Sequence, residues 1–530
     1  MKPETIVAAL RKALPGANVT CQSGLLSETF VALPSQHLHQ AVGLLVGQFG
    51  VRHLSTITGQ DVGDDIELLY HFWAGEGLTL RAALPKGREH IATITDRIIG
   101  ASFYEREVAE MLGVVFEGHP DPRPLLLPDD WRGGAPLRSG WTEPKEEGSD
   151  WPEQQVACEV PGEPEVQITD GDRMIIPIGP QHPLLKEPLS YLLTVEGERV
   201  VDNLLRIGYV HRGIERLCQQ RNYVQNIYLL ERICGICSYI HTATYCQGVE
   251  ALLGLQVPPR AHYLRSLMCE LERIHSHLLI LGVLAENIGF TTIFMYAWRD
   301  REIVLDIMEE LSGGRVSHAA TVIGGVQFDL DEQHARSILA RLDDFEKQME
   351  LLRNVIHHER SFQMRTRDLG HLSTEQVLDY CAVGPMARAS GVDVDLRRDA
   401  PYAAYRDLPT RVVTASEGDV WARTQVRIQE ILESLQLCRQ MVQRIPEGPV
   451  TVRAPRRVPA GEVVSRMEAP RGELIYYIRS DGTDKPARVK VRTPTITSLM
   501  SLTDQLRGIS IADVPVVIGG MDLCIACADR

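Results

Sequence analysis

The stretch ERICGICSYIH, residues 231–241, holds two cysteines separated by two residues, and DLCIACADR, residues 522–530, repeats that spacing. Two Cys-x-x-Cys pairs together offer four thiolate ligands, a set suited to soft metals. The alternatives are free cysteines that pack as small apolar side chains, and a structural zinc site. Paired zinc motifs usually lie close together in sequence, whereas these lie far apart. We therefore expect the two pairs to meet in a buried site, although spacing does not identify its metal.

The rest of the sequence has the composition of a folded globular protein. Of its 530 residues, 44% are hydrophobic and 24% are charged, and the length predicts two or three domains. The net charge of −15 argues against nucleic acid as a partner, because such binders present a basic face. We find neither the ~18 consecutive apolar residues of a membrane-spanning helix nor a secretory signal, and we expect the chain to stay where it is made.

Residues 1–172 are predicted to form two segments of different character. Residues 1–120 read as an α+β domain, and residues 121–172, rich in proline and tryptophan, read as an extended strap lying over a surface. The expected elements of the first domain are an opening amphipathic helix, strands at 53–57, 66–73 and 78–84, and a helix at 97–112.

Residues 173–530 are predicted to form a mainly α-helical domain with small β patches. A hairpin is expected at 190–203 and a β patch at 474–478 and 489–491. The expected helices cover residues 221–254, 259–286, 294–312, 331–358, 417–445 and 496–506.

Four motifs resemble signatures of one enzyme family. The two cysteine motifs resemble the ligand motifs of [NiFe]-hydrogenase large subunits, EAPRG at 468–472 resembles a third signature, and VEGE at 195–198 resembles a fourth. The four motifs occur in the order in which that family has them. The resemblance implies a hydrogenase large-subunit fold for residues 173–530.

Further motifs indicate the subfamily. GPQHP at 179–183 and IGYVHRGIE at 207–215 resemble the 49-kDa-type subunit of complex I, and YEREV at 104–108 with GHP at 118–120 resembles the 30-kDa-type subunit. A chain that fuses both and keeps four cysteines is similar to the large subunit of group 4 membrane-bound hydrogenases of the formate hydrogenlyase and hydrogenase-4 type. One departure is Leu523, which replaces the proline that usually precedes the first cysteine of the last motif.

The resemblance implies a Ni-Fe(CN)2(CO) centre and the reaction 2H⁺ + 2e⁻ ⇌ H₂. In that family all four cysteines hold nickel, so Cys237 and Cys527 would bridge to iron while Cys234 and Cys524 would bind nickel alone. Cys524 would take up a proton and pass it to Glu196, a residue that without the motif would read as an ordinary turn carboxylate.

Other residues would complete the site. Arg471 would place a guanidinium over the metals, with a surface ion pair as the alternative, and Asp522 would pair with it or cap the local turn. His241 and His211 are expected to support the site rather than to bind metal, and Arg388 to line it. The remaining cysteines are expected to pack as apolar side chains: Cys21, Cys158, Cys218, Cys246, Cys269, Cys381 and Cys438.

The resemblance also implies partners. We find no iron–sulfur motif in this sequence, so [4Fe-4S] clusters are expected on partner subunits. These are a 20-kDa-type iron–sulfur small subunit, ferredoxin-like subunits, membrane-embedded complex I or antiporter-like subunits and a formate dehydrogenase. They would hold the chain at the cytoplasmic side of the cell membrane. A C-terminal extension removed after metal insertion is also expected beyond Arg530.

Two alternatives to a hydrogenase remain at the level of sequence. One is a fused complex I-type quinone-reductase subunit without a metal site, which the four cysteines disfavour because that lineage has lost the ligand positions. The other is a zinc-stabilised assembly scaffold.

Overall fold

The computed structural model describes residues 3–142, 167–168, 173–183 and 185–530. Its first part is an α+β unit with a five-stranded sheet of order β1-β2-β5-β4-β3, in which β2 and β5 are parallel and the other pairs antiparallel. The elements are α1 Pro3–Ala13, β1 Thr20–Ser23, β2 Glu28–Ala32, α2 Leu38–Phe49, β3 Leu54–Val62, β4 Asp65–Trp73, β5 Gly77–Pro85, β6 His90–Ala92, α3 Ser102–Leu112 and β7 Val115–Glu117.

The predicted opening helix and the three predicted strands of this unit are confirmed. The predicted helix at 97–112 begins later, at Ser102, because residues 99–101 form a 3₁₀ turn. It ends at Leu112 as expected, and Gly113 follows in a left-handed conformation (φ 71°). The sequence analysis did not identify α2, β1 or β2.

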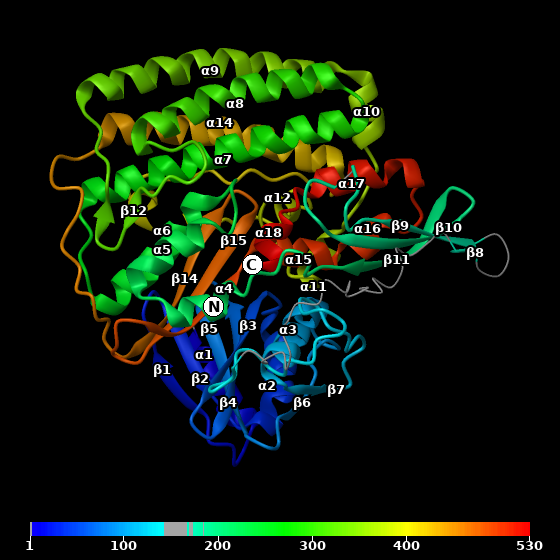
Figure 1. Ribbon diagram of the computed structural model, residues 1–530, viewed down its shortest axis with the longest axis vertical. Coiled ribbons are helices and arrows are strands. Elements are labelled where there is room, and N and C mark those ends of the chain that lie inside the picture. The colour runs from blue at the N-terminus through cyan, green and yellow to red at the C-terminus, as the bar shows by residue number, and fades with distance from the viewer. Residues whose placement is uncertain (1–2, 143–166, 169–172, 184) are drawn as a thin grey trace, which may run out of the picture.

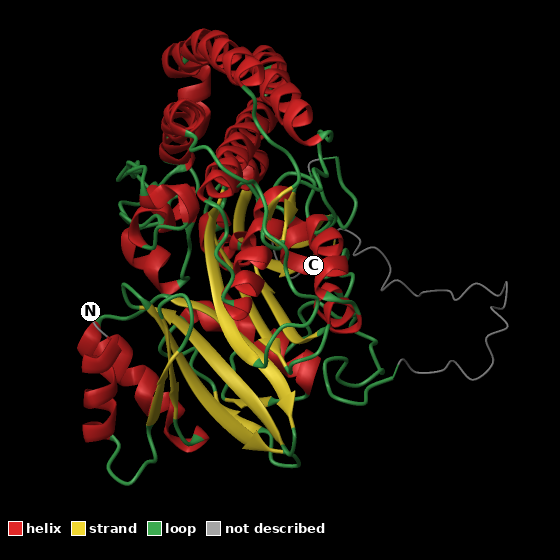
Figure 2. Ribbon diagram, turned by 90° about the vertical axis from the view of Figure 1, so that its left-hand side faces the viewer, coloured by secondary structure: helices red, strands yellow, loops and turns green. Residues whose placement is uncertain are grey.

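The sheet buries both of its faces, and strand β4 shows why. Its alternate residues Ile66, Leu68, Tyr70 and Phe72 belong to the core formed with α1 and α2. Leu69 points to the other face, where its apolar cluster includes Phe30 of the same sheet and Val464, Ile475 and Tyr477 of a second sheet. The N-terminal sheet is therefore held between its own helices and the C-terminal region (Figure 2).

The described part of the predicted strap, residues 121–142, runs beside α3. The backbone N–H groups of Leu125, Leu126 and Leu127 donate to the Glu110 carboxylate, and the Arg106 guanidinium donates to two strap carbonyls. Residues 143–166 and 169–172 of the strap lie outside the described residues. The division of the chain at 120 and at 172 stays a prediction.

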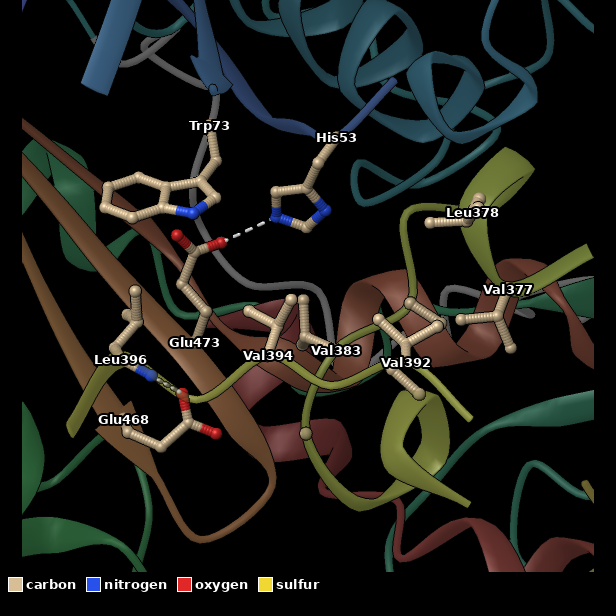
Figure 3. A pocket seen from close by; sticks show the side chains of 13 residues that line it. His53, Trp73, Val377, Leu378, Val383, Val392, Val394, Leu396, Glu468 and Glu473 are labelled. Atoms are coloured by element: carbon tan, nitrogen blue, oxygen red, sulfur yellow. Dashed lines mark hydrogen bonds and ion pairs between the residues drawn. The ribbon is translucent and has the colours of Figure 1, made fainter. Parts of the chain in front are cut away.

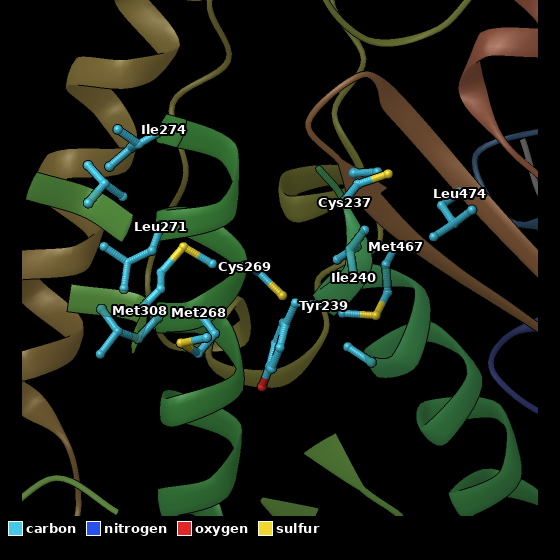
Figure 4. Packing of buried hydrophobic residues seen from close by; sticks show 14 of the residues in the cluster. Cys237, Tyr239, Ile240, Met268, Cys269, Leu271, Ile274, Met308, Met467 and Leu474 are labelled. Atoms are coloured by element: carbon cyan, nitrogen blue, oxygen red, sulfur yellow. The ribbon is translucent and has the colours of Figure 1, made fainter. Parts of the chain in front are cut away.

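The remainder of the chain is rich in helices, as predicted, with three small sheets (Figure 1). The longest helices are α7 Pro259–Ile288, α8 Thr291–Ser312, α9 Glu332–His358 and α14 Val420–Arg444, and they confirm four predicted helices. Helix α7 packs against both α8 and α14. Most of its residues are buried, among them the charged Glu270, Glu272 and Arg273, as is typical of a helix inside a large core. Figure 4 shows side chains of this core around Met268 and Cys269.

Two of the sheets of this region have three or four strands. One is a four-stranded sheet of order β11-β10-β9-β8, and another is a three-stranded antiparallel sheet, β14-β15-β16. Their strands are β8 Gln167–Ile168, β9 Arg173–Ile178, β10 Ser190–Glu196, β11 Arg199–Arg206, β14 Gly461–Ala469, β15 Gly472–Ser480 and β16 Pro486–Arg492, with a third sheet of β12 Thr321–Val322 and β13 Gly325–Val326. The predicted hairpin and β patch are confirmed, whereas β14 was not predicted.

The rest of this region consists of shorter helices. They are α4 Ile214–Gln220, α5 Tyr223–Glu231, α6 Ser238–Leu253, α10 Arg360–Thr366, α11 Thr374–Asp379, α12 Gly384–Arg388, α13 Leu396–Asp399, α15 Pro494–Met500, α16 Leu502–Leu506, α17 Val514–Met521 and α18 Ile525–Asp529. Among the helices of the described residues, none has both the length and the apolar character needed to cross a bilayer.

Buried ion pairs join the N-terminal unit to the three-stranded sheet. Glu28 of β2 pairs with Arg466 of β14, and Glu107 of α3 lies 2.5 Å from the Lys490 ammonium of β16. A largely apolar cavity of about 80 Å³ also lies between the two parts. Figure 3 shows Trp73 and His53 of the N-terminal unit facing Glu473 there, with the His53 and Glu473 side chains 3.0 Å apart.

Candidate metal centre

The first cysteine pair occupies a break between two helices. The sequence predicted one helix over 221–254, but α5 ends at Glu231 and α6 begins at Ser238, with the Cys-Gly-Ile-Cys turn between them. The Cys234 sulfur accepts hydrogen bonds from the backbone N–H groups of Ile236, at 3.2 Å, and Cys237, at 3.4 Å. This turn replaces helical hydrogen bonds with bonds to sulfur, which is why the predicted helix is interrupted here.

The second pair lies in the last turn of the chain. Helix α17 ends at Asp522, which has a left-handed conformation (φ 61°), and α18 begins just after Cys524. The Thr495 hydroxyl accepts from the Cys524 N–H at 3.3 Å, and the Thr493 hydroxyl donates to the Cys527 carbonyl at 3.0 Å. Both threonines flank the start of α15, so that helix fixes the backbone on each side of the pair.

The fold brings all four cysteines together. The sulfur atoms of Cys234 and Cys524 are 3.3 Å apart, and those of Cys237 and Cys527 are 3.5 Å apart. Each of the four side chains is at most 5% exposed. Among the described residues, both groups of three ligand atoms within 4.8 Å of one another fall here: one comprises Cys234, Cys524 and Cys527, and the other Cys237, His241 and Cys527.

Arg471 and Asp522 form a pair beside these sulfurs, as the sequence analysis expected. The Arg471 Nε donates to the Asp522 carboxylate at 3.0 Å and to its backbone carbonyl at 2.8 Å, and Nη2 lies 2.9 Å from the same carboxylate. Burial opposes the charge on Arg471, but Asp522 and the nearby thiolates outweigh it and raise the pKa of the guanidinium. Its Nη1 is buried without a hydrogen-bond partner in the structure. A donor left over beside four sulfurs suits a site that receives an additional group.

The position of Arg471 depends on a close backbone contact. It lies in the tight turn between β14 and β15, and Gly384 at the start of α12 packs directly against this turn. A Cβ on Gly384 would lie 2.2 Å from the Arg471 carbonyl oxygen, and the φ of Gly384 is 66°. Only glycine fits here, because both the space and the backbone conformation exclude a side chain.

Glu196 does not reach the cysteines. It is exposed at the end of β10, opposite Arg199 of β11, in the hairpin that projects away from α18 (Figure 1). The backbone N–H of Ile511 donates to the Glu198 carbonyl, so the adjoining turn contacts the loop after α16. The prediction that Glu196 accepts a proton from Cys524 is therefore wrong, because the strand register places its side chain at the solvent-exposed tip of the hairpin.

The carboxylate that does contact Cys524 is Glu187, in the loop between β9 and β10. Its Oε1 accepts from the Cys524 thiol at 3.9 Å, and its Oε2 accepts from the backbone N–H groups of Ile525 and Ala526. Burial raises the pKa of Glu187, and the Cys234 thiolate adds to the shift. The sequence analysis did not identify this residue. Its position four residues after the GPQHP motif is the feature of the sequence that could have indicated it.

A cavity of about 50 Å³ lies at Glu187. Its lining includes Leu185, Lys186, Leu523 and Ile525. This volume holds a few water molecules, at roughly 10–15 Å³ each. Glu187 therefore lies between the Cys524 sulfur and a space that water can enter.

The two histidines support the site in different ways. His241 Nε2 lies 3.7 Å from the Cys527 sulfur, and Nδ1 hydrogen-bonds the Tyr476 hydroxyl at 2.7 Å. His211 Nδ1 lies 2.6 Å from the carbonyl oxygen of Asp529 and so contacts the terminal segment rather than a sulfur. The supporting roles stay a prediction, since the His241 nitrogen also belongs to one of the two groups of possible ligand atoms.

Arg388 does not line the cysteine site. Its guanidinium lies in a buried ionic network, 2.7 Å from Glu430 and 2.8 Å from Glu468. The expectation that it lines the site is wrong, because those two carboxylates draw it toward α14 and β14. Cys21 is exposed, against its predicted packing role, and Cys158 lies outside the described residues; the other five cysteines assigned to packing are buried.

The IGYVHRGIE segment, residues 207–215, connects the two cysteine loops. Arg212 donates to the Ile233 carbonyl, beside Cys234, at 3.1 Å, and to the Ala526 carbonyl, between Cys524 and Cys527, at 2.7 Å. The Gly208 N–H donates to the Asp529 carboxylate at 2.8 Å. The sequence analysis quoted this motif without predicting a role for it. In the structure, its hydrogen bonds connect the two loops that carry the cysteine pairs.

Comparisons with known proteins agree with this arrangement. The family "Respiratory-chain NADH dehydrogenase, 49 Kd subunit" matches residues 287–457 and 452–530, and the corresponding "30 Kd subunit" family matches residues 31–147. The family "Nickel-dependent hydrogenase" matches residues 212–285, which include the first cysteine pair.

Two relatives match almost the whole length of this chain. "Formate hydrogenlyase subunit 5" and "Hydrogenase-4 component G" of Escherichia coli (strain K12) are each 32% identical over 99% of this chain, covering 93% and 92% of their own lengths. This chain belongs to the family of fused large subunits shared by group 4 membrane-bound hydrogenases and complex I. The family explains why a 30-kDa-like sheet and a 49-kDa-like helical domain occur in one chain.

Two further relatives each match about two thirds of this chain. "Carbon monoxide-induced hydrogenase" of Rhodospirillum rubrum is 42% identical over 67% of this chain and 99% of its own length. A subunit of the membrane-bound sulfane sulfur reductase, an archaeal respiratory membrane complex, superposes with a TM-score of 0.66 at 32% identity, covering 69% of this chain and 100% of that chain. These two relatives are thus a hydrogenase and a chain of a membrane-bound respiratory complex.

Proposed function

We propose that this chain is the catalytic subunit of a membrane-associated [NiFe]-hydrogenase complex of the formate hydrogenlyase type, interconverting protons plus electrons and H₂. The observation that carries the proposal is the convergence of four buried cysteine sulfurs, with Cys234 3.3 Å from Cys524 and Cys237 3.5 Å from Cys527. Thiolates in this number suit nickel and iron, and all four belong to the two ligand motifs.

Cys234, Cys237, Cys524 and Cys527 would hold the metals. When bound, a Ni-Fe(CN)2(CO) centre supplies the two-electron chemistry of H₂. The unpartnered Nη1 of Arg471 supports a role for this residue at the open side of the site, where a preorganised positive charge stabilises developing negative charge. Asp522 keeps that guanidinium in place through its 2.9 Å contact.

Protons would move through Glu187 rather than Glu196. The Cys524 thiol donates to the Glu187 Oε1, and the N–H groups of Ile525 and Ala526 hold the other oxygen, so the carboxylate is oriented toward the sulfur. Water in the cavity of about 50 Å³ would then exchange protons with Glu187. This route needs no movement of the hairpin that carries Glu196.

Electrons would come from partner subunits. Among the described residues, no second cluster of ligand atoms accompanies the cysteine site. The [4Fe-4S] clusters would lie on a 20-kDa-type small subunit and ferredoxin-like subunits, next to membrane-embedded complex I-like subunits and a formate dehydrogenase. The same partners would place this chain at the cytoplasmic face of the membrane.

Elemental analysis of the purified complex, combined with an H₂ assay, tests the proposal. Nickel and iron in this chain together with H₂ turnover would support it. The absence of both nickel and iron would favour a quinone-reductase subunit of complex I type. Zinc alone would favour a structural role, and either result would overturn the assignment.

A further inference from the structure

The side chain of Arg530 is buried in a cluster of charges drawn from three parts of the chain. Its Nε lies 3.2 Å from the carboxylate of Glu215 in α4, and its Nη2 donates to Glu107 in α3 of the N-terminal unit. Arg530 is 2% exposed. The terminal segment that carries two of the four cysteines is therefore bound by a carboxylate of the 30-kDa-like part.

The cluster contains two carboxylates and three cations. Arg488 Nη2 lies 2.7 Å from Glu215, and the Lys490 ammonium lies 2.5 Å from Glu107 and 3.4 Å from Glu215. All five side chains are buried. Loss of the Glu107 charge would leave Glu215 as the counter-charge for three buried cations in this cluster, and an unpaired buried charge is strongly unfavourable.

The anchored side chain is coupled directly to the sulfur positions. Arg530 Nη1 donates to the Ala528 carbonyl at 2.7 Å, the Arg530 N–H donates to the Ala526 carbonyl at 3.2 Å, and the Ala528 N–H donates to the Cys524 carbonyl at 3.1 Å. These bonds make residues 524–530 one short turn. A displaced Arg530 side chain would thus move the turn on which Cys524 and Cys527 lie.

We propose that Glu107 is a positioning residue of the cysteine site: with Glu215 it forms a receptor for the Arg530 side chain, through which the N-terminal unit keeps the terminal cysteine pair closed on the first pair. This inference rests on the proposed function only in the measurement of nickel loss. Its structural content is independent of which metal binds. The proposal assigns the YEREV segment, residues 104–108, a role in positioning the metal site.

The test compares Glu107→Gln with Glu28→Gln in the intact complex. Glu28 is a matched control, because it is also buried and also pairs across the two parts, with Arg466, but does not contact residues 524–530. In Glu107→Gln we expect backbone amide exchange in a peptide covering residues 518–530, and nickel loss to a chelator, to be at least about tenfold faster. Glu28→Gln should match the parent in both measurements.

Several outcomes would overturn the inference. Parental exchange in Glu107→Gln would show that Glu107 does not hold the segment, and equal acceleration in Glu28→Gln would show general loosening between the two parts. If Glu107→Gln does not fold, Glu107→Asp, which keeps the charge one methylene shorter, should still exchange faster than the parent, and parental exchange in this variant would overturn the inference. The double variant Glu107→Gln, Arg530→Gln should exchange no faster than the faster single variant; additive effects would refute the pairing. A parent without nickel would refute the proposed function but leave the exchange test intact.

Discussion

Replacement of Glu187 by glutamine separates proton transfer from metal binding. The glutamine carbonyl can accept the N–H groups of Ile525 and Ala526 as Glu187 Oε2 does, so the terminal turn and the metals should be retained. Exchanging a charged for a neutral acceptor costs about 1–2 kcal/mol. The amide cannot take a proton from the Cys524 sulfur, 3.9 Å from Oε1 in the parent.

The expected loss in H₂ turnover is about 10²–10⁴-fold, the usual contribution of a positioned acid or base, which corresponds to about 3–5 kcal/mol of barrier. H₂ evolution from an artificial one-electron donor should be measured together with nickel and iron content. Glu196→Gln is the matched control, since Glu196 is exposed on the β10–β11 hairpin, and it should turn over like the parent. Parental rates for Glu187→Gln, or an equal loss in Glu196→Gln, would refute the route.

Three further predictions concern the site and the fold. Cys237→Ser and Cys527→Ser should each abolish H₂ activity and lower bound nickel and iron, because a hydroxyl is a poor ligand for soft metals; full activity in either variant would exclude the site. Arg471→Lys should keep the metals but lose at least about tenfold in turnover, because lysine cannot contact the Asp522 carboxylate with two nitrogens; unchanged turnover would contradict this. Burial raises the pKa of Glu105 from 4.5 to about 7, so the folded chain keeps a proton that the unfolded chain releases. The contribution of Glu105 to stability should therefore fall by about 3 kcal/mol as the pH rises across that interval, and Glu105→Gln should reduce the pH dependence of thermal unfolding by that amount.

Periodic patterns predicted the regular elements well. Helix α7, expected at 259–286, covers Pro259–Ile288, because its apolar residues recur at helical spacing over its whole length. The expected helix at 221–254 is interrupted, because the Cys-Gly-Ile-Cys turn gives the backbone sulfur acceptors in place of helical carbonyls. Strand β14 was missed, since both of its faces are buried and its charged Arg466 and Glu468 hide the strand pattern.

The sequence predicted the site residues that belong to short motifs, but not those that only the fold brings close to the cysteines. The four cysteines and the pair of Arg471 with Asp522 follow from short motifs, and the structure brings them together. Glu187 could not be distinguished from Glu196 by type or neighbourhood, because only the course of the β9–β10 loop places one of them beside Cys524. The contact of Glu107 with Arg530, 423 positions apart, has no local signal.

The separation of the two cysteine pairs also has a consequence during synthesis. Cys527 emerges from the ribosome 290 residues after Cys237, a delay of roughly 15–60 s at typical rates of chain elongation. Throughout that interval the thiols of Cys234 and Cys237 lack the residues that bury them, and the receptor for Arg530 is empty. Protection of these thiols from oxidation then depends on reductants around the nascent chain rather than on the fold.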